Sequence, residues 1–139
     1  MRNMNCELIG PRKLEYYINN PYSYIIDIRS KEMYDSGHIK GAENYPYDYL
    51  SSYEGIRAFK SQYRDKSAIY ILYCETGTNS LLVCNKLALY GYIVKSLAGG
   101  IRGYNGRYLQ LKSLYLKVWN FSEEKLWFNF FTWFFMVSI

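Results

Sequence analysis

The segment from residue 68 to residue 92 joins a continuous apolar run to a helical pattern. Residues 68–74 read AIYILYC, and a short run of branched and aromatic residues is typical of a strand that is buried on both faces of a parallel sheet. Apolar residues then recur at helical spacing, at Leu81, Leu82, Cys84, Leu87 and Ala88. Gly77 lies between the two patterns and gives the backbone the freedom to turn. This segment predicts a buried strand, a tight loop and a helix that packs on the strand.

Strand and helix patterns alternate along the rest of the chain. Further strands are expected at 6–9, 24–28 and 93–97. Helices are expected at 11–20, 31–35, 48–63 and 102–116, with a weak interruption at Gly55 and a polar connection over 38–46. Such alternation predicts an α/β fold, with a mostly parallel central sheet, helices on both faces and right-handed crossovers. We expect one domain over residues 1–119, followed by an apolar aromatic extension over 120–139.

Composition is typical of soluble globular proteins. The chain has 139 residues, of which 50% are hydrophobic and 21% charged, and a domain of this size buries an ordinary core. The formal net charge is +5, but the Lys and Arg residues are scattered among acidic residues rather than gathered in runs. Proteins that bind nucleic acid concentrate basic residues on a patch or stripe. We therefore expect no nucleic-acid partner.

The cysteines and the histidine limit the metal and redox chemistry. There are three cysteines and one histidine, which form no C-x-x-C pair and no zinc ligand set, so we expect no metal and no cofactor. Cys84 recurs among leucines and is expected to be buried and inert, and Cys6 is expected to be ordinary too. The first ten residues contain no apolar core of a secretory signal. A reducing cytoplasm is the expected location.

Cys74 is the candidate catalytic residue. It ends the strand predicted over 68–74, and open α/β sheets bind their ligands at the carboxyl ends of strands. The N–H groups of the following loop, together with the positive end of the next helix, form a site for an anion. A thiol held there ionises easily. The site therefore suits a thiolate, a persulfide carried on it, or an oxyanion beside it.

Three segments carry a resemblance to a known family. Residues 74–80, CETGTNS, resemble the active-site loop of the single-domain rhodaneses, the thiosulfate sulfurtransferase-like proteins, in which a cysteine opens the loop and a glycine takes the fourth place. Residues 25–29, IIDIR, and 37–46, GHIKGAENYP, are similar to the family's early signature. Residues 97–101, LAGGI, with Tyr104, are similar to its late turn. The motifs come in the family's order and cover about residues 6–112.

The resemblance implies a rhodanese-like fold and a sulfurtransferase that needs no cofactor or metal. Cys74 would attack the outer sulfur of thiosulfate or another persulfide donor, carry that sulfur as a persulfide, and hand it to cyanide or a thiol acceptor. The loop would cradle the terminal sulfur, largely through backbone N–H groups. The substrate-binding residues implied are Glu75, Thr76, Gly77, Thr78, Asn79 and Ser80.

Three further polar residues are expected to support the site. Asp27 and Arg29 lie at a strand end, where a carboxylate beside an arginine is usually a hydrogen-bonded pair. His38 is expected to bond backbone groups and to order its loop. Many rhodaneses have Arg at the position of Asn79, and Glu75 adds a negative charge. The loop is therefore less suited to doubly charged thiosulfate than to other persulfide donors.

Two other functions remain open at this point. A cysteine phosphatase needs an arginine six places after the cysteine to bind phosphate, and Ser80 occupies that place. The other alternative is a non-catalytic or regulatory rhodanese-like binding module. The poorly basic loop favours this module, and the presence of Cys74 disfavours it.

The carboxyl-terminal extension lies beyond the resemblance. Its last 14 residues, Leu126 to Ile139, read LWFNFFTWFFMVSI. A helix of this length spans roughly 21 Å, which is short of the roughly 30 Å hydrocarbon core of a bilayer. Three roles remain open: a helix docked on the domain itself, a segment for self-association, partner binding or membrane-surface contact, or an irregular extension without a role.

Overall fold

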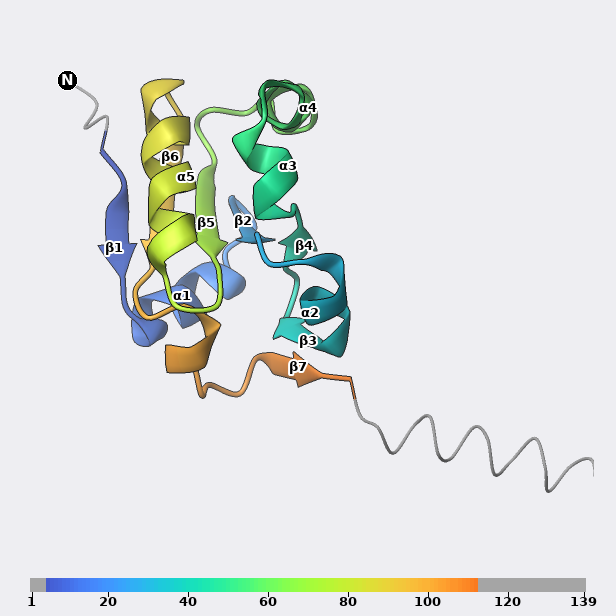
Figure 1. Cartoon of the computed structure of the whole chain (residues 1–139). Coiled ribbons are helices and arrows are strands. Elements are labelled where there is room, and N and C mark those ends of the chain that lie inside the picture. The colour runs from blue at the N-terminus through green and yellow to red at the C-terminus, as the bar shows by residue number, and fades with distance from the viewer. Residues whose placement is uncertain (1–4, 113–139) are drawn as a thin grey trace, which may run out of the picture.

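A parallel five-stranded sheet forms the centre of the domain (Figure 1). The computed structural model describes residues 5–112. The strand order is β1-β6-β5-β2-β4, and every neighbouring pair is parallel. The strands are β1 (Glu7–Ile9), β2 (Ser23–Asp27), β4 (Glu43–Asn44), β5 (Ile69–Tyr73) and β6 (Ile93–Leu97). The α/β fold with a parallel sheet is therefore confirmed, and Cys74 follows the central strand.

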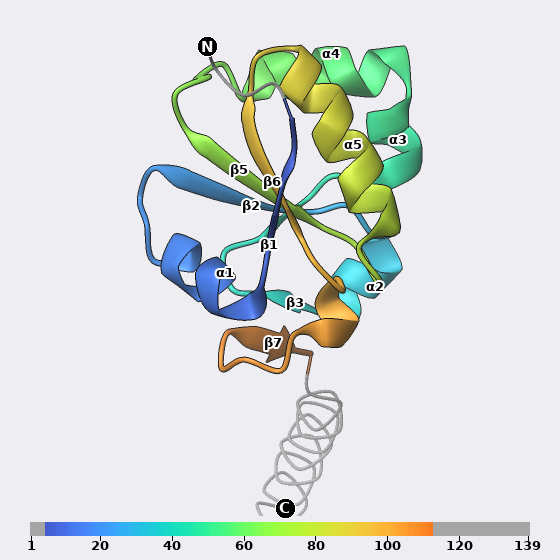
Figure 2. The same cartoon turned by 90° about the vertical axis from the view of Figure 1, so that its left-hand side faces the viewer.

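Helices cover both faces of the sheet, as expected (Figures 1 and 2). One face carries α1, and the other carries α3, α4 and α5, while α2 lies beyond the end of β2. The helices are α1 (Pro11–Ile18), α2 (Lys31–Ser36), α3 (Tyr47–Ser51), α4 (Tyr53–Gln62) and α5 (Thr78–Leu89). Ser30 precedes α2 and caps it, because its hydroxyl accepts a hydrogen bond from the N–H of Met33.

The central strand β5 is apolar throughout because it contributes to two cores. Tyr70 and Leu72 belong to the core between the sheet and α4 and α5. Ile71 and Tyr73 belong to the core on the α1 side. All four side chains are fully buried, so successive residues of the strand point into opposite cores. This explains why the strand shows a continuous apolar run rather than alternation.

The expected polar connection over 38–46 contains short strands instead. It holds β4 and most of β3 (Gly37–Ile39), and β3 pairs in antiparallel fashion with β7 (Leu109–Leu111). The helix expected over 102–116 is therefore wrong in its described part, where a single 3-10 turn (Ile101–Gly103) precedes β7. Residues 109–111 form a strand because they pair with the distant strand β3, and this pairing outweighs the local helical pattern.

The helix expected over 48–63 is divided in two, and the break lies at Ser52 rather than at Gly55. Ser52 ends α3 and caps α4, since its hydroxyl accepts the N–H of Gly55 at 3.0 Å. Gly55 has a packing role instead. A Cβ at this position would lie 1.8 Å from the carbonyl oxygen of Tyr49, so only glycine lets the two helices approach this closely.

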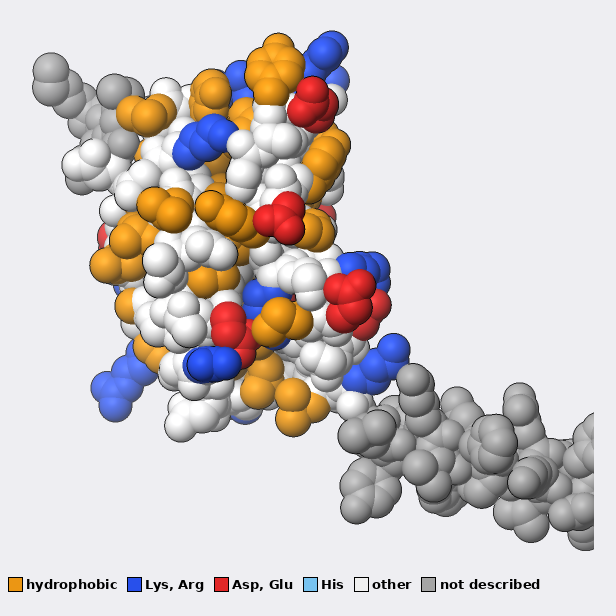
Figure 3. Space-filling view, in the orientation of Figure 1, with side chains coloured by type: hydrophobic (Ala, Val, Ile, Leu, Met, Phe, Trp, Pro, Cys, Tyr) orange, Lys and Arg blue, Asp and Glu red, His pale blue; other side chains and the backbone are white. Residues whose placement is uncertain are grey.

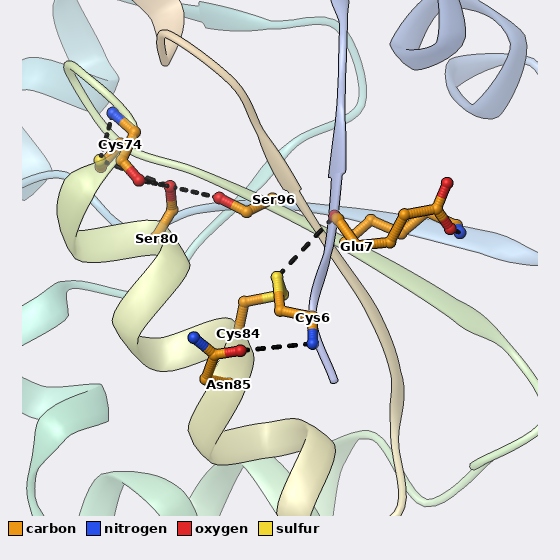
Figure 4. The surroundings of a disulfide bond; sticks show 9 residues. Cys6, Glu7, Cys74, Ser80, Cys84, Asn85 and Ser96 are labelled. Atoms are coloured by element: carbon orange, nitrogen blue, oxygen red, sulfur yellow. Dashed lines mark hydrogen bonds and ion pairs between the residues drawn. A yellow bond between two sulfur atoms is a disulfide. The ribbon is translucent and has the colours of Figure 1, made fainter. Parts of the chain in front are cut away.

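Cys6 and Cys84 form a disulfide (Figure 4). Cys84 is buried as expected, but the bond overturns the expectations that Cys84 is inert and that Cys6 is ordinary. Their Cα atoms are 5.4 Å apart although 78 residues separate them in sequence. The bond ties the chain just before edge strand β1 to the middle of α5. Disulfides persist mainly in oxidising compartments. The location expected from the sequence, a reducing cytoplasm, stays a prediction.

Part of the chain for which the sequence made predictions lies outside residues 5–112. The extension over 120–139 and the final part of the helix expected over 102–116 lie outside the described residues. Within residues 5–112, no helix has the length and apolar character needed to cross a membrane. In the same range, no cluster of His, Cys, Asp or Glu side chains is arranged to hold a metal ion.

Candidate active site

Cys74 lies at the carboxyl edge of the sheet, between β5 and α5. Its side chain is only 6% exposed, and it is the one free cysteine of the three, all of which the structure describes. The register pairs Asp27 of β2 with Tyr73 of β5, so the residues that follow these two strands meet at one edge. Arg29 and Glu75 are thereby brought together beside the sulfur.

The loop after Cys74 curls around the sulfur atom. Gly77 has a positive φ of 100°, and its N–H donates to the sulfur of Cys74 at 3.1 Å. A Cβ on Gly77 would lie 3.1 Å from the backbone nitrogen of Gly99 and 3.2 Å from the carbonyl oxygen of Leu97. Glycine is therefore required twice here, for its backbone conformation and for the close approach of the turn after β6.

The turn after β6 holds the loop from the other side. The N–H of Ile101 donates to the carbonyl oxygen of Cys74 at 2.9 Å, and the N–H of Arg102 donates to that of Glu75 at 3.1 Å. Gly100 has φ of +59°, and a Cβ there would lie 2.5 Å from the carbonyl of Glu75. The residues 97–101 that resemble a family motif are thus a direct support for the Cys74 loop.

Two buried serines lie behind the sulfur (Figure 4). The hydroxyl of Ser80 is 3.5 Å from the sulfur of Cys74 and 2.8 Å from the hydroxyl of Ser96 on β6. Both serines are completely buried. Ser96 was missed by sequence reasoning. The available signal was a polar residue next to the carboxyl end of a predicted strand, between Lys95 and Leu97.

This environment favours the thiolate form of Cys74. Burial alone would raise the pKa of the thiol. Hydrogen bonds to the sulfur more than offset this effect of burial, so the pKa of Cys74 lies below its usual value. They come from the Ser80 hydroxyl and from the backbone N–H groups of Ser80, Gly77 and Thr76. The positive end of α5 acts in the same direction.

Glu75 is neutralised by two arginines from outside the loop. Its Oε1 accepts a hydrogen bond from Nε of Arg102 at 2.9 Å, and its Oε2 lies 3.7 Å from Nη1 of Arg29. Oε2 is buried and has no hydrogen-bond partner among the described residues. Sequence reasoning missed Arg102, although its place directly after the turn at 97–101 was a possible signal.

Asp27 and Arg29 form the structural pair that was expected. Nη2 of Arg29 is 2.6 Å from Oδ2 of Asp27 and donates to the carbonyl oxygen of Gly37, also at 2.6 Å. Both residues are buried. Burial would lower the pKa of Arg29, but Asp27 more than offsets this and the pKa of Arg29 is raised. Arg29 therefore stays charged and ties β2 to the start of β3.

His38 lies away from the sulfur. Its Nδ1 is 2.9 Å from the carbonyl oxygen of Tyr34, and its ring stacks on the Tyr34 ring with centroids 3.9 Å apart. It does not line the pocket that contains Cys74. These contacts agree with the expectation that His38 orders its loop.

A pocket of about 450 Å³ opens onto Cys74. The candidate catalytic residue Cys74 lines it, together with four of the six expected substrate-binding residues, namely Glu75, Thr76, Thr78 and Asn79. Gly77 and Ser80 contact the sulfur from beneath instead. The other lining residues are 28–33 and 46–48, which come from the chain after β2 and from the start of α3.

Charges of both signs are mixed on this side of the molecule. Figure 3 shows basic and acidic side chains interspersed among apolar and neutral ones, without a continuous field of either sign. The pocket itself is lined by two basic residues, Arg29 and Lys31, and by three acidic residues, Glu32, Asp48 and Glu75. The pocket is therefore not a simple anion-binding site.

A family model for the rhodanese-like domain matches residues 11–107. The chain belongs to the rhodanese-like domain family. The matched residues include the Cys74 loop, the turn after β6 and every residue that lines the pocket, so the match covers the whole site. A comparison with curated proteins found no match.

Solved structures resemble this rhodanese-like domain over most of its length. A rhodanese-like domain protein from Staphylococcus aureus is 25% identical, with a TM-score of 0.62, over 77% of this chain and 99% of that one. Reduced CoADR-RHD from Bacillus anthracis is 23% identical, with a TM-score of 0.60, over 71% of this chain. This chain spans only 16% of that protein.

A third structure extends the comparison to a eukaryote. Saccharomyces cerevisiae Ygr203w, described as a homolog of single-domain rhodanese and of the Cdc25 phosphatase catalytic domain, is 19% identical. Its TM-score is 0.63 over 74% of this chain and 84% of that one. The rhodanese-like domain therefore has a sulfurtransferase-type fold, and its activity has to be argued from its own residues.

Proposed function

We propose that this rhodanese-like domain is a sulfurtransferase that carries sulfane sulfur as a persulfide on Cys74. The observation that carries the proposal is the placement of the sulfur atom. The sulfur lies at the pocket and accepts a hydrogen bond from the N–H of Gly77 at 3.1 Å. This N–H and the groups of Ser80 lower the pKa of the Cys74 thiol below its usual value. A thiolate in such a place is a ready nucleophile.

The reaction needs no external oxidant or reductant. The Cys74 thiolate attacks the outer sulfur of a persulfide donor or of thiosulfate, a new S–S bond forms, and the old S–S bond breaks. The donor leaves as a thiolate or as sulfite. An acceptor thiolate or cyanide then attacks the outer sulfur of the Cys74 persulfide and releases the Cys74 thiolate.

The first turn of α5 supports the negatively charged outer sulfur. The amino-terminal N–H groups of a helix have no acceptor within the helix. In α5 these belong to Thr78, Asn79 and neighbouring residues, and both side chains line the pocket. Free N–H groups and the positive helix end stabilise an anion there without a basic side chain.

A non-catalytic binding module is the second candidate. The observation that favours it is Glu75, which lines the pocket and has a buried oxygen without a hydrogen-bond partner among the described residues. Phosphatase chemistry has less support. Ser80, at the position where a phosphatase has its arginine, is completely buried behind the sulfur.

The test is the intact mass of the protein after treatment with thiosulfate or with a small organic persulfide. Wild type and Cys74→Ser are treated side by side, and cyanide is added afterwards. We expect wild type alone to gain one sulfur atom and to lose it to cyanide. If folded wild type gains no sulfur from either donor, the sulfurtransferase proposal fails and the binding module takes its place.

A further inference from the structure

The basic residues of the Cys74 pocket are already paired with carboxylates. Arg29 is held 2.6 Å from Asp27, and its side chain is only 7% exposed. Lys31 lies 2.5 Å from Asp35, which is not part of the pocket lining. Arg29 cannot bind an incoming anion without giving up a buried partner, and the exposed charge of Lys31 is partly offset by Asp35.

Two of the acidic residues have no such partner. Glu32 and Asp48 line the pocket and are exposed to solvent. Within residues 5–112, neither forms an ion pair. The third acid, Glu75, is balanced by Arg29 and Arg102. The unpaired acidic charge of the pocket lining is therefore that of Glu32 and Asp48.

The size and lining of the pocket also disfavour a small inorganic anion. A volume of about 450 Å³ lies in the range that holds organic ligands. Met33, Pro46 and Tyr47 contribute apolar surface to the wall. A carbon chain can contact such a wall, whereas thiosulfate has no apolar part.

We propose that the pocket selects organic thiols and persulfides that carry an ammonium group near their sulfur. Glu32 and Asp48 attract the ammonium group, the apolar wall contacts the carbon chain, and Cys74 exchanges sulfur with the substrate. This assignment rests on the proposed function of Cys74 as a sulfur carrier. It names amine-bearing thiols, such as cysteine or cysteamine, as the substrate class in preference to thiosulfate.

The first experiment tests the charge preference without requiring sulfur transfer. Cys74 is treated with two probes of similar size, the cationic 2-aminoethyl methanethiosulfonate and the anionic 2-sulfonatoethyl methanethiosulfonate. The thiolate attacks the sulfur of the probe that bears the ethyl group, forms a mixed disulfide and releases methanesulfinate. Both rates are divided by the rates measured with free 2-mercaptoethanol. Cys74→Ser serves as the blank.

We expect the corrected rate to be roughly 3- to 10-fold higher for the cationic probe, because two nearby carboxylates act through water. In the double variant Glu32→Gln/Asp48→Asn this preference should disappear. The matched control is Glu54→Gln/Asp65→Asn, which makes the same change in net charge at exposed residues outside the pocket. An equal or faster reaction of the anionic probe with wild type overturns the proposal.

The second experiment uses the protein loaded with sulfur on Cys74. Four acceptors are compared: cysteamine, cysteine, 2-mercaptoethanol and 3-mercaptopropionate, each corrected for its thiolate fraction. We expect cysteamine to be fastest and 3-mercaptopropionate slowest, with a difference that shrinks as salt is added. A flat or reversed order overturns the proposal. Failure to load sulfur at all refutes the proposed function instead, and the probe experiment still decides the charge preference.

Discussion

The hydroxyl oxygens of Ser80 and Ser96 lie 2.8 Å apart, in fully buried space behind the sulfur of Cys74. A thiolate can only accept hydrogen bonds, so a hydrogen bond between Ser80 and the ionised Cys74 requires the Ser80 hydroxyl to donate to the sulfur rather than to the carbonyl oxygen of Gly77, which lies 3.2 Å away. The oxygen of Ser80 is then free to accept the proton of Ser96. Such a chain of donors polarises each member and strengthens the bond to the charged end.

Removal of the Ser80 hydroxyl should raise the pKa of Cys74. The rate of alkylation by iodoacetamide rises with pH through the pKa of the thiol and then levels off. In Ser80→Ala the curve should move to higher pH, and the rate at neutral pH should fall roughly 10-fold, as loss of a hydrogen bond to a charged group implies. Ser96→Ala should shift the curve in the same direction by less.

The control for these variants is Ser23→Ala. Ser23 is only partly buried, and its hydroxyl donates to the carbonyl oxygens of Tyr17 and Asn20 at the opposite end of the sheet. This variant should lose stability and keep the alkylation curve of wild type. Unchanged curves in both Ser80→Ala and Ser96→Ala would show that the buried serines do not tune the thiol.

Substitution of Gly100 should disrupt the loop of Cys74. A Cβ at Gly100 would lie 2.5 Å from the carbonyl of Glu75, at a φ of +59°. We expect Gly100→Ala to cost about 2–5 kcal/mol in the free energy of unfolding, from the clash and from a backbone conformation, with ψ of −161°, that is essentially restricted to glycine. Urea unfolding measures the loss.

The matched control is Gly41→Ala. Gly41 has a similar positive φ of 77°, but nothing lies within 4 Å of the position of its Cβ. This variant should cost only the conformational part, about 1–2 kcal/mol. Equal losses in the two variants would mean that the close approach of Gly100 to the loop does not matter.

An arginine at position 79 should improve the use of thiosulfate. Asn79 lines the pocket in the first turn of α5, and an added cation there attracts a doubly charged donor. We expect Asn79→Arg to accelerate sulfur loading from thiosulfate roughly 5-fold or more. Asn105→Arg adds the same charge at an exposed residue outside the pocket and should have no such effect. A decrease in Asn79→Arg would show that the missing arginine does not limit thiosulfate use.

Reduction of the Cys6–Cys84 bond should destabilise the domain without altering the thiol chemistry. The bond closes a loop of 78 residues, and the chain-entropy model assigns about 4 kcal/mol to a loop of that length. Urea unfolding with and without dithiothreitol should show this difference. The control is Cys6→Ala/Cys84→Ala, which should be insensitive to dithiothreitol. A stability that dithiothreitol leaves unchanged in wild type would mean that the bond contributes nothing.

The sequence by itself determined the features that depend on neighbouring residues. The apolar run of β5, Gly77 at the turn and the helical spacing of α5 placed Cys74 correctly at a strand end, because these signals are local backbone preferences. The fold class followed from the order of such elements, since parallel strands joined by helices have few possible arrangements.

Tertiary structure decided the contacts between residues far apart in the chain. Ser80 and Ser96 are 16 residues apart, Glu75 and Arg102 are 27 apart, and Cys6 and Cys84 are 78 apart. No local pattern encodes such pairs. The helix expected over 102–116 fails for the same reason, because its residues pair with the distant β3. The position of the nucleophile is local information, whereas its charge balance and hydrogen bonds depend on how distant strands pack together.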